Sequence, residues 1–149
     1  MSEFPFSNST VKDIVRFAFD GDEDISMYCD PNDKLKTIEE LVGVICDKIL
    51  DYYFFGDCVF KPLVVEDSLV GYYFTCGDLL VSFGVNKEFR KSEFLREVFK
   101  EISGSFKGEF YSYMWERNTR AIEWLKKCGM EEVECQIKGA KKLKLSICH

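Results

Sequence analysis

The spacing of apolar residues predicts two helices in the first third of the chain. Apolar residues that recur at helical spacing predict a first helix from Ser9 or Thr10 to about Phe19. A second helix begins after Thr37, which has capping-box spacing with Glu40, and ends between 51 and 55. The buried stripes of the two helices are Val11, Ile14, Val15 and Ala18, and then Ile38, Leu41, Val42, Ile45 and Ile49.

Three short apolar runs follow, and turn-forming residues separate them. The runs span 59–65, 69–75 and 79–85, with Glu66-Asp67-Ser68 and Cys76-Gly77-Asp78 between them. Connections this short join strands that run in opposite directions, so the pattern predicts an antiparallel meander.

The second half of the chain alternates between helix and strand patterns. A helix with one apolar face starts near Ser92 and closes at Ser103-Gly104, and a strand spans 110–115. A strand, a helix and a strand in this order form a right-handed crossover, so we expect 79–85 and 110–115 to lie parallel and adjacent.

The last segment predicts one more helix and a hairpin. Asn118 is a residue type that caps helix starts, and Gly129 is one that ends helices, so a short helix lies between them. The hairpin consists of 132–137 and 141–147 around Gly139, and its second arm alternates as a half-exposed strand does.

Length and charge limit the classes of function. With 149 residues, 46% of them hydrophobic, the chain suits a single domain over 1–149, helical over 1–57 and built on a sheet over 58–149. A net charge of −6 argues against a nucleic-acid binder. The N-terminus has no signal pattern, and no apolar run is long enough to span a bilayer. We therefore expect a cytoplasmic monomer or homodimer that binds neither nucleic acid nor membrane.

The seven cysteines include no C-x-x-C pair, and most lie beside apolar neighbours. We interpret them as reduced thiols that fill core volume, with disulfides or a metal site as the alternative. The only histidine, His149, is the last residue, which argues against a histidine-based triad or zinc site inside the fold. No metal site is expected.

The segment from Asn118 to Met130 resembles the last conserved segment of the GNAT acyltransferases, whose pattern is roughly N-x-x-A-x-x-x-Y-x-x-x-G-F. Asn118, Ala121 and Gly129 match this pattern. Arg117-Asn118 and the following Ala-Ile-x-Trp-Leu run are most similar to GNAT-like proteins that bacteriophages encode. The resemblance implies an α/β (α+β) fold with a mixed, mainly antiparallel central sheet, one parallel strand pair and flanking helices.

The resemblance also implies a site for acetyl-CoA where the two parallel strands separate. Backbone amides near Phe83 and Val85 would lie beside the cofactor, and the pyrophosphate would sit on the first turn of the helix that starts near Ser92. The residues that this implies as cofactor contacts are Phe83, Val85, Arg90, Lys91, Ser92 and Asn118. The alternative role of Asn118 is to cap its helix and do nothing else.

Two departures from the family pattern bear on activity. The family's phosphate loop reads roughly R-G-x-G-x-G/A, but Glu93, Phe94 and Leu95 follow Ser92 here, so we expect crowding and an added negative charge near the diphosphate. Leu125 stands where the family often has the tyrosine that protonates the departing thiolate, and leucine has no proton to give.

Tyr113 and Glu116 are the remaining candidates for a catalytic acid or base, because they lie on or just after the 110–115 strand. The alternative is that they are an ordinary strand aromatic and a solvated carboxylate. The resemblance implies transfer of an acetyl group from acetyl-CoA to a small-molecule or protein amine. The competing hypotheses are an inactive GNAT scaffold that binds a protein partner or serves a bacteriophage virion, and an unrelated α/β binding domain.

Overall fold

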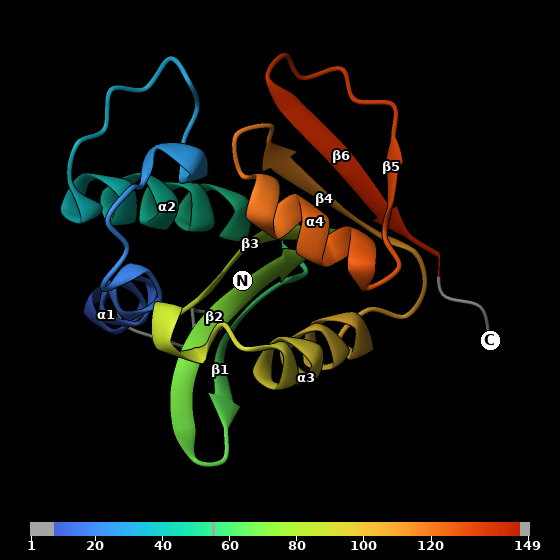
Figure 1. The fold of residues 1–149 in the computed structure, drawn as a ribbon, viewed down its shortest axis with the longest axis horizontal. Helices are drawn as coiled ribbons and strands as arrows, with labels where there is room; N and C mark the ends of the chain where they lie inside the picture. The colour runs from blue at the N-terminus through green and yellow to red at the C-terminus, as the bar shows by residue number, and fades with distance from the viewer. Residues whose placement is uncertain (1–7, 55, 147–149) are drawn as a thin grey trace.

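The computed structural model describes residues 8–54 and 56–146, and Figure 1 shows their arrangement. Helices and strands follow one another in the predicted order. The elements are α1 (Asn8–Phe19), the short 3-10 helix η1 (Ser26–Tyr28), α2 (Ile38–Tyr53), β1 (Cys58–Val65), β2 (Ser68–Cys76), β3 (Leu79–Val85), a second 3-10 helix η2 (Lys87–Phe89), α3 (Ser92–Gly104), β4 (Phe110–Trp115), α4 (Thr119–Lys127), β5 (Glu131–Val133) and β6 (Ala140–Leu145).

One six-stranded sheet, in the order β1-β2-β3-β4-β6-β5, forms the middle of the molecule. Its neighbours are antiparallel except for the β3–β4 pair, which is parallel, so the predicted fold class is confirmed. The closing hairpin is also present, but its first arm is only three residues long. Residues 134–139 leave the ladder, and Ile147, at the end of the second predicted arm, lies outside the described residues.

Helices cover both faces of the sheet, and each face has its own core (Figure 1). On one face α1 and α2 pack residues such as Val15 and Leu41 against Tyr72 and Phe74 of β2. On the other face α3 and α4 pack residues such as Val98 and Leu125 against the intervening Tyr73. Tyr72 and Tyr73 serve opposite cores because successive side chains of a strand alternate.

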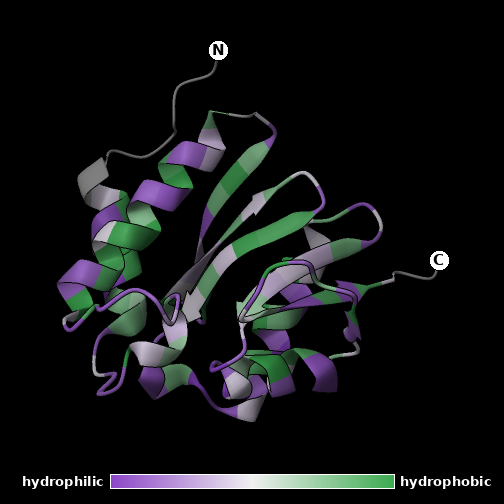
Figure 2. Cartoon of the chain, turned by 90° about the horizontal axis from the view of Figure 1, so that it is seen from above, coloured by the Kyte–Doolittle hydropathy of each residue, from purple (hydrophilic) through white to green (hydrophobic). Residues whose placement is uncertain are grey.

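The helices carry the amphipathic pattern that the sequence predicts. In Figure 2 the central strands are mostly green, and the helices on either side show bands of green and purple. Thr37 and Glu40 form the predicted capping box, in which the Glu40 amide donates to Thr37 Oγ1 at 3.2 Å. Among the described residues, no helix combines the length and apolarity needed to cross a bilayer.

A β-bulge in β3 forces the parallel strands apart. Phe74 and Thr75 of β2 face Ser82 and Leu80, so Val81 is an extra residue in β3. Bulges bend the strand that carries them. Pairing between β3 and β4 is limited to two residue pairs, Leu79 with Tyr111 and Leu80 with Ser112, and all of it lies before the bulge. Beyond Val81 the two strands separate, and this gap positions the candidate site.

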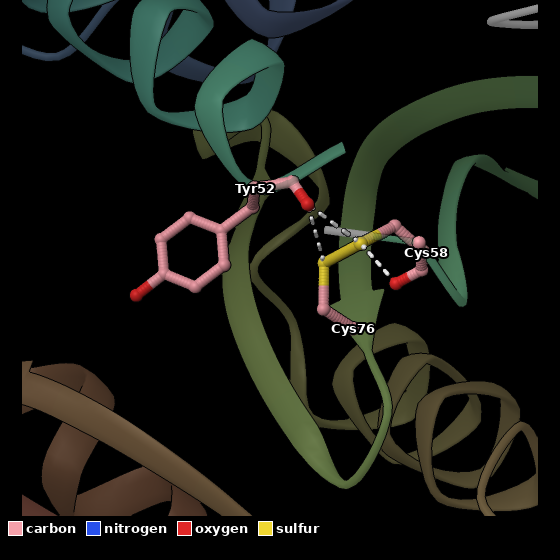
Figure 3. The surroundings of a disulfide bond; sticks show 4 residues. Tyr52, Cys58 and Cys76 are labelled. Carbon is pink, nitrogen blue, oxygen red and sulfur yellow. Dashed lines mark hydrogen bonds between the residues drawn. A yellow bond between two sulfur atoms is a disulfide. The ribbon is translucent and has the colours of Figure 1, made fainter. Parts of the chain in front are cut away.

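The prediction that the cysteines are all reduced thiols is wrong for one pair. Cys58 and Cys76 form a disulfide between β1 and β2 (Figure 3). They are direct cross-strand partners with Cα atoms 4.1 Å apart, which brings the sulfurs within bonding reach. The carbonyl oxygen of Tyr52, in the last turn of α2, lies 3.1 Å from Cys58 Sγ. The bond therefore ties the open end of the β1–β2 hairpin where α2 meets it.

We expect the disulfide to be visible in a thiol count. Unfolded protein under non-reducing conditions should titrate two fewer thiols with Ellman's reagent than the fully reduced protein, since one disulfide removes two thiols. Cys58→Ser should abolish this difference and lower the free energy of unfolding by about 3 kcal/mol. Cys135→Ser, a free cysteine on the same chain, should preserve the difference. Equal counts in the two conditions would contradict the assigned bond.

Candidate functional site

Two cavities meet where β3 and β4 separate. The first, the α2-side cavity, has a volume of about 280 Å³ and is lined by residues of α2, including Leu41 and Lys48. The second, the α4-side cavity, has a volume of about 270 Å³ and is lined by residues of α4, including Arg120 and Trp124. Five residues line both cavities and so define their junction: Phe19, Tyr28, Phe83, Met114 and Asn118.

The backbone of β3 presents polar groups to this gap. The amide of Asn86 donates to the carbonyl of Val70 at 2.7 Å, so the backbone N–H and C=O groups of Gly84 and Asn86 point toward β2. Because backbone groups alternate along a strand, those of Phe83 and Val85 point to the open edge. Arg90 Nε confirms this direction for Val85, whose carbonyl accepts its hydrogen bond at 2.8 Å. Phe83 and Val85 therefore turn backbone groups toward the gap between β3 and β4.

The start of α3 leaves backbone donors unused. Lys91 precedes the helix and provides no side-chain cap, so the first-turn amides lack both an intrahelical partner and a capping partner. Ser92 lines a groove between α3 and α4, whereas Lys91 lines neither cavity. Glu93 is exposed and lines neither the cavities nor the groove. The negative charge that we expected near the diphosphate therefore lies outside them. Leu95 does line both the α4-side cavity and the groove.

Arg90 is held by a carboxylate that lies 68 positions earlier in the chain. Its Nη1 and Nη2 donate to Oδ1 and Oδ2 of Asp22, each at 2.7 Å, in a bidentate pair. The side chains are 15% and 6% exposed, so the pair is largely shielded from water. Arg90 still lines the α4-side cavity, but Asp22 neutralises most of its charge. Through Arg90, which also donates to Val85, this pair fastens the turn between α1 and η1 to the end of β3.

Asn118 occupies the N-cap position of α4, yet its side chain makes no capping hydrogen bond. Its Nδ2 lies 4.0 Å from Met114 Sδ, and the residue lines both cavities. A capping role alone therefore does not describe it. Leu125, at the family's tyrosine position, is fully buried in the core, so no proton donor reaches the cavities from there. Trp124 lines the α4-side cavity, with its ring centroid 5.5 Å from that of Phe83.

The two predicted acid–base candidates do not come together. Tyr113 lines the α2-side cavity, and Lys142 Nζ lies 5.5 Å from its ring centroid. Glu116 is exposed in the turn after β4 and lines neither cavity. The structure thus separates Glu116 from the gap between β3 and β4 and leaves Tyr113 on one side of it.

Tyr28 is a junction residue that the sequence analysis missed. Its hydroxyl donates to Asp22 Oδ2 at 3.2 Å and accepts from Arg120 Nη2 at 3.1 Å. Burial raises the pKa of this phenol above its ordinary value, with Arg90 acting in the opposite direction. The local sequence of Tyr28 carries little signal, because η1 is three residues long and the partner Arg120 is 92 positions away along the chain.

A basic groove of about 750 Å³ continues from the α4-side cavity between α3 and α4. The cavity and the groove share four lining residues, Arg90, Leu95, Arg120 and Trp124. Five cationic side chains but only one carboxylate line it: Arg90, Arg96, Lys100, Arg120, Lys127 and Glu123. Within residues 8–54 and 56–146, no salt bridge involves Arg96, Lys100 or Lys127. In a chain of net charge −6, the groove is a local region of positive charge.

Solved acetyltransferase structures have the same fold. An acetyltransferase from Thermus thermophilus superposes with a TM-score of 0.66 at 12% identity, over 96% of this chain and 94% of that one. The PaiA N-acetyltransferase from Thermoplasma acidophilum, solved with coenzyme A, gives 0.60 at 14% identity over 94% and 92%. Spermidine N-acetyltransferase from Vibrio cholerae, solved with CoA and spermine, gives 0.55 at 14% identity over 98% and 93%.

No family model and no curated protein matches the sequence. At identities this low, the structural likeness defines the fold alone. The chain therefore has the GNAT acetyltransferase fold, and a fold does not by itself determine which chemistry its residues perform.

The Arg90–Asp22 pair predicts a large loss of stability on neutralisation. Asp22→Asn should lower the free energy of unfolding by about 3 kcal/mol, because it leaves the guanidinium largely buried without its counter-charge. The matched control is Glu39→Gln, which breaks the Arg16–Glu39 pair, whose side chains are 62% and 52% exposed. That loss should stay below about 1 kcal/mol. Urea unfolding measures both, and equal losses would contradict the structural role given to Asp22.

Proposed function

We propose that this protein is an acetyl-CoA-dependent N-acetyltransferase that works with a glycine-free phosphate loop. The observation that carries the proposal is the continuous path from the junction, through the α4-side cavity, into the basic groove. A cofactor with an acyl thioester at one end and phosphates at the other needs an apolar channel that ends in a cationic one. The path has this order.

The described residues supply contacts along that path. Open-edge amides of Phe83 and Val85 would hydrogen-bond the amide-containing arm of the cofactor, as a neighbouring strand would. The unused amides at the start of α3 would take the pyrophosphate. The unpaired cations of the groove, such as Lys100 and Lys127, would face the remaining phosphate. These cations supply charge that Arg90 does not, because Arg90 is committed to Asp22.

The acceptor would enter from the α2-side cavity. This cavity opens from the same junction on the opposite side, so an amine held there would meet the thioester where the two cavities join. Asp30 and Asp33 line it together with Tyr113 and Lys48. Acetyl-CoA supplies the activated acyl group, and the chain's own residues bind the two partners and bring the nitrogen to the carbonyl carbon.

An inactive scaffold that binds a protein, for example in a bacteriophage particle, is the second candidate. The buried Leu125 favours it, since this position of α4 presents no acid to the cavities. The neutralised Arg90 favours it as well. The two candidates differ in their affinity for CoA, because the scaffold role does not require the basic groove to hold a nucleotide.

Calorimetric titration of CoA at low ionic strength tests the proposal, since phosphate contacts are least screened there. We expect micromolar binding, and Lys100→Glu should weaken it about tenfold, which corresponds to about 1.4 kcal/mol. The matched control is Lys107→Glu, the same charge reversal at an exposed position that lines neither the cavities nor the groove. It should change the affinity for CoA less than about twofold, because an exposed charge away from the ligand contributes little to binding.

Absence of binding at millimolar CoA would overturn the enzyme proposal in favour of the scaffold. Equal weakening by Lys100→Glu and Lys107→Glu would reject the basic groove as the phosphate site.

A further inference from the structure

In the proposed function, the acyl group is transferred at the junction of the two cavities. Among the described residues, those of the junction are the ones reached from both the cofactor side and the acceptor side. Of these five residues, Phe19, Phe83 and Met114 carry no ionisable group, and Asn118 has an amide that neither gains nor loses a proton at neutral pH. Tyr28 is the one junction residue whose side chain carries an acidic proton.

We propose that Tyr28 is the catalytic acid that protonates the departing sulfur, an inference that rests on the proposed acetyltransferase function. The amine nitrogen forms a bond to the thioester carbonyl carbon, and the carbon–sulfur bond breaks. Tyr28 gives its hydroxyl proton to the sulfur, which leaves as a thiol. The nitrogen releases one proton to water, and water returns one proton to the Tyr28 oxygen, so the residue is restored.

The contacts of the hydroxyl suit this role. Arg120 donates to the phenol oxygen at 3.1 Å, so a cation stands beside the phenolate that proton transfer creates. In this structure the hydroxyl donates its one proton to Asp22 at 3.2 Å, so transfer to the sulfur begins when the hydroxyl turns away from Asp22, whose charge Arg90 matches. Burial, aided by Asp22 and opposed by Arg90 and Arg120, raises the pKa of the phenol. The two arginines that oppose this rise, Arg90 and Arg120, are the groups that stabilise the phenolate left by proton transfer.

Other positions are placed less well for the same step. Tyr113 lines the α2-side cavity but not the α4-side cavity, where the thiol arm would lie. The ammonium of Lys142 lies near its ring, 5.5 Å from the centroid. The family's usual position is Leu125, which is fully buried. Tyr28 reaches the junction from η1, a different element from the one that carries the family's tyrosine.

Binding to CoA and to desulfo-CoA separates proton donation from a purely structural role. At a pH where the CoA thiol is largely ionised, Tyr28→Phe should weaken CoA binding about tenfold, the effect of losing a hydrogen bond to a charged atom. It should leave desulfo-CoA binding unchanged, because that ligand has no sulfur to receive the proton. The matched control is Tyr111→Phe, which removes a phenol oxygen from a residue of β4 that lines neither cavity.

Steady-state kinetics on the same variants completes the test. Tyr28→Phe should lower kcat about 100-fold, the usual lower bound for loss of a general acid, and change KM for acetyl-CoA little. Tyr111→Phe should retain both constants. Equal weakening of CoA and desulfo-CoA, or an unchanged kcat in Tyr28→Phe, would overturn the role of Tyr28 while the acetyltransferase function stands. If the unmodified protein binds neither ligand, the function itself fails, and the role of Tyr28 fails with it.

Discussion

The site depends on one irregularity, the extra residue Val81 in β3. It ends the parallel pairing with β4 after Leu79 and Leu80 and leaves the backbone of Phe83 and Val85 without a strand partner on that side. Unpaired backbone groups inside a protein are costly, so such an edge has to be satisfied by something. Arg90 Nε donates a hydrogen bond to the carbonyl of Val85. A ligand with amide groups would take the remaining positions.

Positive charge gathers close to the open edge of β3. The chain is acidic overall, yet cations gather between α3 and α4, and their groove opens from the cavity beside β3. Glycines in a phosphate loop allow the backbone to approach an anion closely. Side-chain cations act over a longer distance and need no such approach. The groove therefore offers a physical reason why a loop that carries Phe94 and Leu95 is compatible with phosphate binding.

Much of the fold could be predicted from the sequence, because its signals are local. The Thr37–Glu40 box, the strands 59–65 and 79–85, and the crossover to 110–115 are patterns of nearby residues, and the structure contains each of them. The contacts that the prediction missed join distant residues. Asp22 meets Arg90 68 positions away, Tyr28 meets Arg120 92 positions away, and Cys58 bonds Cys76 through strand register. No local pattern encodes these contacts.

The gap between β3 and β4 and the basic groove together form the proposed binding site for acetyl-CoA. The most direct measurement is a titration of the ¹⁵N-labelled protein with acetyl-CoA, followed by amide chemical shifts. We expect the shifts to concentrate at Phe83, at Val85, in the first turn of α3 and along the groove face of α4, with β1 unaffected. Absence of shifts, or shifts that gather on the β1 edge, would contradict binding at the gap and the groove.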